Sequence, residues 1–381
     1  MRFAHISDLH LGKRLNGFSM LEEQKYILEE ILQILEKEKV SGVWMAGDIY
    51  DKPIPPAEAV TLFDDFLVQL AKRKYHVFVI SGNHDSPERI AFGARLVSAC
   101  NIYLSPVYNG EVEPISLADE HGEINVYMLP FVKPIHVRHY FSEEEISTYT
   151  EAVKCAIAHM NVEETKRNVI LAHQFVTGAM KSESEDISVG GLDNVDAEVF
   201  EAFDYVALGH IHRGQTMGSE NIRYSGTPLK YSFSEVNHEK SVTIVDLKEK
   251  GNTEIYTVPL IPRHDLRKIR GSFEEVISSE FETDADKEAY VHVTLTDEMD
   301  IPNAFHKLQT VYPNIMQMEY EIRSKKNPTV FDKTADGKKM DPLELFQEFY
   351  ETMNHQPLQS SQQDYLVEKI NEIWSADGRG K

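Results

Sequence analysis

The sequence predicts an α/β protein in which a largely parallel sheet is covered by helices on both faces. Short apolar segments alternate with longer segments whose apolar residues recur at helical spacing, and this alternation starts at the N-terminus. Strands that alternate with helices are typical of parallel sheets, and antiparallel strands can be added late in such a domain. The catalytic chemistry of these sheets gathers where the strands end.

The first 80 residues predict a βαβαβ unit that ends in the turn tripeptide Ser81-Gly82-Asn83. Its strands are expected at 2–7, 41–47 and 76–80, and its helices at 20–39 and 57–74. Further strands are expected at 124–129, 168–172, 205–208, 222–224 and 241–247, with a helix near 144–160.

The chain changes character after residue 260, and the distribution of charge marks the change. Residues 261–271 carry four basic and one acidic side chain, whereas residues 272–322 carry two basic and twelve acidic ones. The latter stretch predicts a small α/β domain, with helices near 273–281 and 302–311 and strands at 290–295 and 317–322. We therefore expect four parts: a main domain at 1–260, a cap at 261–325, a linker at 326–340 and a helical segment at 341–378.

Overall composition excludes several classes of protein. The chain has 62 acidic and 39 basic residues, and its net charge of −23 argues against binding nucleic acid through its own field. Two cysteines, Cys100 and Cys155, are too few for a disulfide framework or a cysteine-based zinc module, so a reducing compartment is expected. No apolar run approaches the roughly 20 residues that span a bilayer, and Asp8 and His10 interrupt any signal peptide. A cytoplasmic protein is expected.

Five predicted strands end in residues that can bind metal. These residues are Asp8 and His10, Asp48, Asn83, His173, and His210 with His212. Their carboxylate, imidazole and amide groups suit manganese, iron or zinc, and the donors are numerous enough for two ions. Two-metal hydrolases hold their ions about 3.5–4 Å apart through a shared ligand, for which Asp48 on a central strand is the natural residue. Asp51, which follows closely, is expected to stabilise the turn or orient a ligand.

These motifs, in this order, resemble the calcineurin-like metallophosphoesterase superfamily and, within it, the SbcD-type nuclease subunits of the DNA double-strand-break-repair family. The motifs are Asp8-Leu9-His10, Gly47-Asp48-Ile49-Tyr50-Asp51, Gly82-Asn83-His84-Asp85, an isolated His173 and Gly209-His210-Ile211-His212. Protein phosphatases of the superfamily continue the second motif as D-R-G. This chain continues it as Asp51-Lys52-Pro53, which favours the nuclease branch.

The resemblance implies a metallophosphoesterase sandwich with helices on both faces, a small α/β cap for DNA recognition and a C-terminal helical tail. It also implies two divalent ions, with Mn²⁺ as the expected metal. One ion would be held by Asp8, His10, Asp48 and His212, and the other by Asp48, Asn83, His173 and His210. His84 would not bind metal. We expect it to assist the leaving group, with a neighbouring carboxylate such as Asp85 to hold it.

The same resemblance implies a DNA nuclease of repair, recombination and replication, with double-strand 3′→5′ exonuclease and single-strand or hairpin endonuclease activity. Its implied partner is an SbcC-type SMC-like ATPase bound by the C-terminal helices, within a heterotetramer that contains a homodimer of this chain, at the nucleoid. The basic residues Arg263, Arg267, Lys268 and Arg270 could contact DNA phosphates or could simply be solvated. Because acidic residues outnumber basic ones, the isolated chain should bind DNA weakly, and the ATPase should supply much of the affinity for DNA.

Two alternatives remain open. A phosphoesterase that acts on small-molecule or protein phosphoesters would share the metal site but would not need the cap and tail. A non-catalytic scaffold is disfavoured, because His84 and an open two-metal site have no structural purpose.

Overall fold

The computed structural model describes residues 1–185, 193–278, 287–321, 343, 346–347, 350 and 357–376. The chain forms two compact units. The first comprises Met1–Ile269, Glu280–His292 and Leu308–Gln317, and the second comprises Arg270–Ser279, Val293–Lys307 and Met318–Lys381.

The first unit contains a six-stranded sheet in the order β16-β15-β1-β4-β5-β6. Strands β1, β4, β5 and β6 are parallel, as the predicted βαβαβ unit requires, whereas β15 pairs antiparallel with β1 and β16 pairs antiparallel with β15. The strands are β1 (Arg2–Ile6), β4 (Gly42–Ala46), β5 (His76–Ile80), β6 (Ile102–Leu104), β15 (Ser241–Leu247) and β16 (Thr253–Pro259).

A second six-stranded sheet has the order β13-β14-β12-β9-β8-β7. Its central strands β8, β9, β12 and β14 are parallel, and the edge strands β7 and β13 are antiparallel. The strands are β7 (Ile115–Asp119), β8 (Gly122–Leu129), β9 (Arg167–His173), β12 (Tyr205–Gly209), β13 (Gln215–Met217) and β14 (Ser219–Tyr224).

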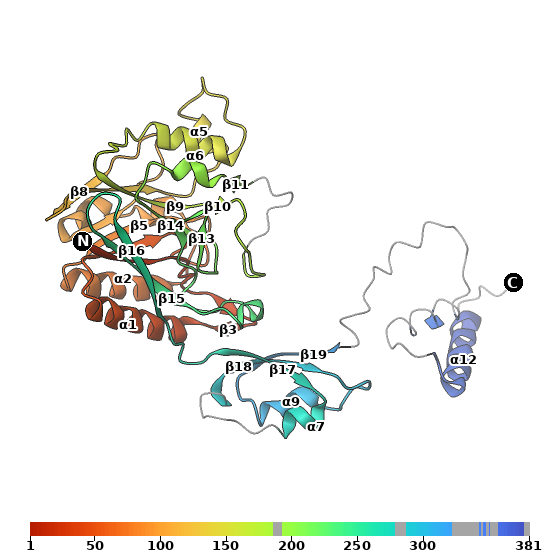
Figure 1. Cartoon of the computed structure of the whole chain (residues 1–381). Coiled ribbons are helices and arrows are strands. Elements are labelled where there is room, and N and C mark those ends of the chain that lie inside the picture. Colours follow the sequence, from red (N-terminus) through yellow and green to blue (C-terminus); the bar gives the residue numbers. More distant parts are fainter. Residues whose placement is uncertain are drawn as a thin grey trace. The chain divides into compact units, whose positions relative to one another are not determined.

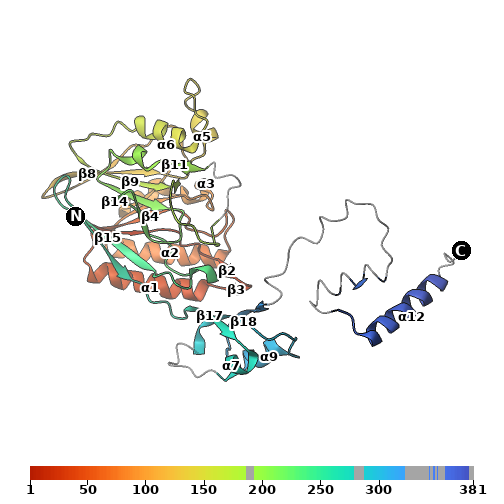
Figure 2. The same cartoon turned by 45° about the vertical axis from the view of Figure 1, so that its right-hand side comes forward.

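The two sheets pack face to face, and helices cover their outer faces (Figures 1 and 2). Trp44 of the first sheet stacks on Phe3 and on Tyr205 of the second, with ring centroids 4.4 and 5.5 Å apart. The first sheet carries α1 (Leu21–Lys37) and α2 (Ala57–Lys72), and the second carries α5 (Pro134–Arg138) and α6 (Tyr149–Ala158). The sandwich implied by the resemblance is therefore confirmed.

The expectation of one sheet with helices on both faces needs correction. Each sheet has helices on one face and the other sheet on its second face. The central strand β4 is buried at every position, so its residues do not reveal which face meets a helix and which meets a sheet.

Shorter elements complete the first unit. They are β2 (Arg14–Leu15), β3 (Phe18–Ser19), α3 (Pro87–Ile90), α4 (Ala94–Val97), η1 (Ser98–Cys100), β10 (Phe175–Val176), β11 (Asn194–Val195), η2 (Ala197–Phe200) and η3 (Phe233–Glu235).

A three-stranded sheet follows in the order β17-β18-β19, with β17 (Leu266–Gly271), β18 (Tyr290–Leu295) and β19 (Ile315–Tyr320). Helices α7 (Phe273–Ile277) and α9 (Ala304–Gln309) lie near the positions that the sequence predicts. The basic run at 263–270, at the start of the expected cap, is in part strand β17. The apolar spacing of residues 341–378 predicts two helices, and helix α12 (Ser360–Ala376) lies where the second is expected.

The expected linker 326–340 lies outside the described residues, as does most of the first tail helix. None of the helices in the described part of the chain combines the length and apolarity needed to cross a membrane.

Candidate metal centre

The predicted ligands gather where strands of both sheets end. Asp8 and His10 follow β1, Asp48 follows β4 and Asn83 follows β5, all in the first sheet. From the second sheet, His173 ends β9, and His210 and His212 follow β12. The sandwich thus brings together residues that the sequence analysis expected at one edge of a single sheet.

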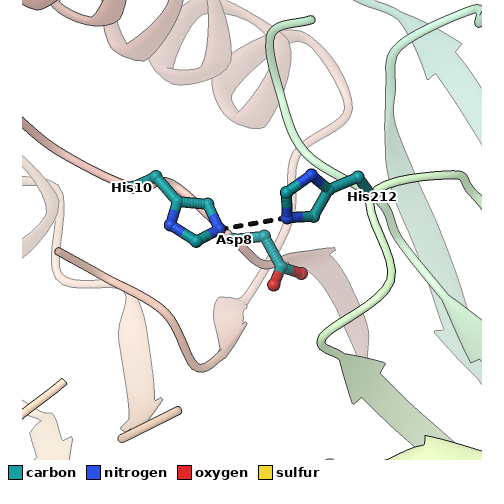
Figure 3. A group of neighbouring side chains, drawn as sticks. All are labelled: Asp8, His10 and His212. Atoms are coloured by element: carbon teal, nitrogen blue, oxygen red, sulfur yellow. Dashed lines mark hydrogen bonds between the residues drawn. The ribbon is translucent and has the colours of Figure 1, made fainter. Parts of the chain in front are cut away.

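Three of these side chains form a first group. The donor atoms of Asp8, His10 and His212 lie within 4.8 Å of one another, and all three residues are buried (Figure 3). The two imidazoles face each other, with His10 Nε2 and His212 Nε2 only 3.1 Å apart. Nitrogens that face each other in this way beside a carboxylate are arranged to share a cation.

A second group lies next to the first. Asp8, Asp48 and His173 offer donor atoms within 4.8 Å of one another. Asn83 Oδ1 lies 3.0 Å from His173 Nε2 and 2.9 Å from His210 Nδ1.

The Asp48 carboxylate belongs to the second group and also approaches His10 of the first, while Asp8 is common to both groups. Asp48 Oδ2 is 3.3 Å from His173 Nε2 and 3.7 Å from His10 Nε2. This is the position that the sequence analysis expected for a ligand shared by two ions.

The backbone at the ligands adopts a conformation that non-glycine residues rarely take. The φ angles of Asp8, His10, Asp48 and His210 are 54°, 44°, 50° and 101°. Such angles cost about 1–3 kcal/mol each and persist only where the surroundings enforce them. Here backbone hydrogen bonds contribute, from Asp8 N to Gly47 O and from His10 N to Asp48 O, both 3.0 Å long.

Two glycines allow the strand ends to approach each other. A Cβ atom on Gly82 would collide with the carboxylate and the backbone nitrogen of Asp48, and one on Gly209 would collide with the carbonyl oxygen of Ala46. Glycine is therefore required at both positions for steric reasons.

Burial and close contacts shift the pKa values of the groups in the centre, and the contact with Asp48 raises the pKa of His173 to about 9 against the opposing effect of burial. Burial and, less strongly, the nearby Asp48 raise the pKa of Asp8 to about 6, although the His173 and His212 imidazoles oppose this shift. Burial also acts on Asp48, but the imidazoles of His173 and His10 outweigh it and hold the pKa of Asp48 well below its usual range. Burial lowers the pKa of His210 to about 3, which keeps this ring neutral and able to bind metal.

The donor set fits divalent metal. Two carboxylates, four imidazoles and one amide oxygen converge, with no thiolate among them, and this is the chemistry of manganese, iron or zinc sites. In addition, His10 Nδ1 is buried and has no hydrogen-bond partner among the described residues.

His84 lies at the rim of this centre. Its backbone nitrogen donates to Asp48 Oδ1 at 2.9 Å, and its Nδ1 lies 3.2 Å from the carbonyl oxygen of Asp51. The His10 and His84 rings are perpendicular, with centroids 4.9 Å apart.

Asp85 differs from the sequence-based expectation that it holds His84. Its carboxylate accepts hydrogen bonds from the backbone nitrogens of Ile49, Tyr50 and Gly82, at 3.1, 2.9 and 2.9 Å. The turns after β4 and β5 leave these three N–H groups pointing inward, and a buried carboxylate satisfies them. Asp85 therefore stabilises the two turns that carry Asp48 and Asn83 by accepting hydrogen bonds from both.

Asp51 and the basic residues lie outside the donor groups. Asp51 Oδ1 lies 2.8 Å from Lys13 Nζ and 3.8 Å from His10 Nδ1, so it stands behind a ligand. The basic side chains of 263–270 are exposed, and Arg270 pairs with Glu321 at 2.6 Å. The exposed basic side chains are Arg263, Arg267, Lys268 and Arg270.

Four side chains near the His212 ring and backbone were not predicted from the sequence. Ser184, Glu185, Glu235 and Lys240 all contact this residue or each other. They lie in segments without helical or strand periodicity, so nothing in the spacing of the sequence singled them out.

Comparison with known families agrees with this geometry. Residues 1–214 match the family model described as calcineurin-like phosphoesterase, and residues 262–354 match one described as type 5 capsule protein repressor C-terminal domain. Fold and site thus define a calcineurin-like phosphoesterase, and the chain belongs to that family.

Two curated relatives place the chain more narrowly. The SbcD subunit of nuclease SbcCD from Staphylococcus epidermidis is 32% identical over 387 residues, covering 99% of this chain and 100% of the relative. The protein of the same name from Staphylococcus saprophyticus is 30% identical over 374 residues, covering 97% of each. Within the phosphoesterases, the chain therefore belongs to the SbcD branch. A solved dimetal phosphatase from Danio rerio is 13% identical, with a TM-score of 0.41, and the match covers 68% of this chain and 99% of that structure. This similarity is too low to support any conclusion about the chain.

Proposed function

We propose that this chain is the metal-dependent DNA nuclease subunit of an SbcCD-type complex. The observation that carries the proposal is the convergence of seven metal-binding side chains from both sheets, in a chain that is similar over nearly its full length to proteins named as the SbcD subunit of nuclease SbcCD.

In this proposal the centre holds two Mn²⁺ ions. Asp8, His10, Asp48 and His212 hold one, and Asp48, Asn83, His173 and His210 hold the other. The closeness of Asp8, His10 and His212, of Asp48 to His173, and of Asn83 to His210 supports this division. Divalent ions bound there would supply an activated water as the nucleophile and would neutralise charge on the phosphodiester.

His84 then gives a proton to the leaving oxygen. A ring nitrogen of His84 lies within 4.8 Å of donor atoms of His10 and Asp48, and its backbone contact with Asp48 fixes the turn on which it sits. The Asp51 carbonyl accepts a hydrogen bond from Nδ1–H, which leaves Nε2 as the nitrogen that exchanges the proton. Asp85 supports this geometry through the backbone of the two turns.

The proposed substrates are DNA ends, cleaved by a double-strand 3′→5′ exonuclease activity, and single strands or hairpins, cleaved endonucleolytically, in repair, recombination and replication. The exposed Arg263, Arg267, Lys268 and Arg270 would contact phosphates. Since the net charge is −23, most of the affinity for DNA would come from the partner.

The proposed partner is an SbcC-type SMC-like ATPase that binds the C-terminal helices. Apolar side chains in the described part of the tail support a binding role, because they line a shallow groove of about 490 Å³ that includes Tyr350, Leu358 and Leu366. The exposure of Phe92 (86%) and Leu96 (81%), four residues apart, supports a homodimer within a heterotetramer. Such a complex would act in the cytoplasm, at the nucleoid.

The test is purified full-length chain with Mn²⁺ on blunt duplex and hairpin DNA, with and without an SbcC-type ATPase and ATP. We expect Mn²⁺-dependent cleavage that the ATPase increases, and loss of ATPase binding when residues 340–381 are deleted. Release of phosphate from a small ester, with no DNA cleavage under any condition, would favour the alternative of a phosphoesterase for small-molecule or protein phosphoesters.

A further inference from the structure

We propose that Ser184 and Glu235 are positioning residues, which fix the imidazole of His212 so that its Nε2 is the atom presented to metal. This inference rests on the metal centre proposed above and assigns a role to two residues outside the donor groups.

A short chain of hydrogen bonds reaches from the His212 ring to a buried carboxylate. Ser184 Oγ lies 2.6 Å from His212 Nδ1 and donates its own hydrogen to Glu235 Oε1. Since the hydroxyl hydrogen points to Glu235, its oxygen accepts the hydrogen of Nδ1. The proton of neutral His212 is thereby kept on Nδ1, and the lone pair is on Nε2, the nitrogen that faces His10.

Glu235 is itself held in place by a buried cation. It is fully buried and forms an ion pair with Lys240, whose Nζ also donates to His212 O at 2.9 Å and to Thr227 Oγ1 at 2.6 Å. Lys240 therefore neutralises the carboxylate and anchors the backbone of the same ligand. Such a pair keeps Glu235 ionised although it is buried, so that it accepts the hydrogen bond.

The segment of Ser184 contacts His212 a second time. The carboxylate of the neighbouring Glu185 accepts a hydrogen bond of 2.6 Å from His212 N. The ring, the backbone nitrogen and the backbone oxygen of this one ligand are thus each held by a side chain distant in sequence.

Another ligand shows that a carboxylate relay is not a general requirement of the fold. His173 is oriented by a backbone oxygen, because its Nδ1 lies 2.7 Å from Ala46 O. A carboxylate behind an imidazole makes it a more basic ligand than a carbonyl does, so the relay should strengthen metal binding at His212 specifically.

A buried ion pair could also serve stability alone, and variants separate the two roles. Ser184→Ala removes the relay but leaves Glu235 and Lys240 paired, while Ser184→Thr retains the hydroxyl. Asp204→Asn is the matched control, because Asp204 is a buried carboxylate paired with Lys250 before strand β12, whereas His212 follows that strand.

The experiment is calorimetric titration of Mn²⁺ into metal-free full-length protein, with melting temperatures measured alongside. We expect two ions in the wild type, and about 10–100-fold weaker binding of one ion in Ser184→Ala. Ser184→Thr should bind as the wild type does. Asp204→Asn should melt at lower temperature with unchanged Mn²⁺ affinity.

Wild-type affinity in Ser184→Ala, or equal weakening in Ser184→Thr, would overturn the positioning role while leaving the metal centre intact. A wild type that binds no Mn²⁺ would instead overturn the proposed centre itself, so the two failures are distinguishable.

Discussion

The two ends of the sandwich both bury charged side chains, but they balance these charges differently. At the end where β1 and β9 begin, Asp119 pairs with Arg167 and with the N-terminal amine. Arg167 also donates to the carbonyl oxygens of Gly122 and Lys248, at 2.7 and 2.9 Å. At this end the protein supplies both signs of charge.

At the end where the same strands finish, the carboxylates of Asp8 and Asp48 meet imidazoles, and the buried Lys240 nearby pairs with Glu235. Asp8 and Asp48 are surrounded by rings that we propose as metal ligands, and His10 Nδ1 has no hydrogen-bond partner among the described residues. The comparison shows how one scaffold separates stability from function: one end is complete in the protein alone, and the other is arranged so that cations complete it.

Asp48→Ala should have the largest effect, because it removes the carboxylate that approaches a ligand of each proposed ion, His10 and His173. We expect loss of both ions and a fall in nuclease activity beyond the roughly 10²–10⁴-fold range of a general acid. Metal content per chain and DNA cleavage measure this. Asp246→Ala, which removes a partly exposed carboxylate paired with Arg2, should keep both ions. Two bound ions in Asp48→Ala would contradict its bridging role.

His84→Gln comes next. We expect activity to fall by about 10²–10⁴-fold with metal content unchanged, because the leaving oxygen loses its proton donor while the donor groups remain. His76→Gln is the matched control, since His76 begins β5 and lies at the other end of the strand. Full activity in His84→Gln would remove this residue from the mechanism.

Asp119→Asn should affect stability and leave metal binding alone. It leaves Arg167 buried without its carboxylate, so the free energy of unfolding should fall by about 3–5 kcal/mol at pH 7. Urea unfolding of metal-free protein measures this. Unchanged stability would show that the backbone carbonyls suffice for Arg167.

The difference in free energy of unfolding between the wild type and Asp119→Asn should depend on pH. Burial tends to raise the pKa of Asp119, but Arg167 and the N-terminal amine outweigh it and hold the pKa below its usual range. The stabilisation is therefore present above the unfolded-state pKa of about 3.9 and is lost as the pH falls below it. The gap between wild type and Asp119→Asn should narrow below about pH 4.

Lys250→Ala should have the smallest effect, at most about 1 kcal/mol, because its side chain is 41% exposed although its partner Asp204 is buried. The loss should shrink further in high salt. A loss of stability as large as that of Asp119→Asn would mean that solvent exposure does not decide how strongly the ion pairs at this end of the sandwich stabilise the fold.

Much of the site could be predicted because its chemistry sits at strand ends. A short apolar strand followed by Asp, His or Asn is visible in the sequence, and the strands before Asp8, Asp48, Asn83 and His210 are all present. The edge strands β7 and β16 escaped prediction. Their side chains alternate between partly buried and exposed, as in strands that border solvent. The sequences of such strands resemble those of loops.

The contacts of Asp85 and Ser184 could not be predicted from spacing. Asp85 neighbours His84 in sequence, yet it bonds to backbone groups at Ile49 and Tyr50, more than thirty residues away. Ser184 and Glu235 are 51 residues apart. Each contact depends on how turns of different strands meet.

The sequence by itself determined the kinds of ligand, their order and their place after strands, because local apolar patterns and covalent spacing settle which residues a strand presents at its end. Only the tertiary structure decided that these ends belong to two stacked sheets, and which carboxylate stands behind which imidazole. Such contacts join residues up to 202 positions apart, as in His10 and His212. They follow from the packing of Phe3, Trp44 and Tyr205 between the sheets, which no local pattern specifies.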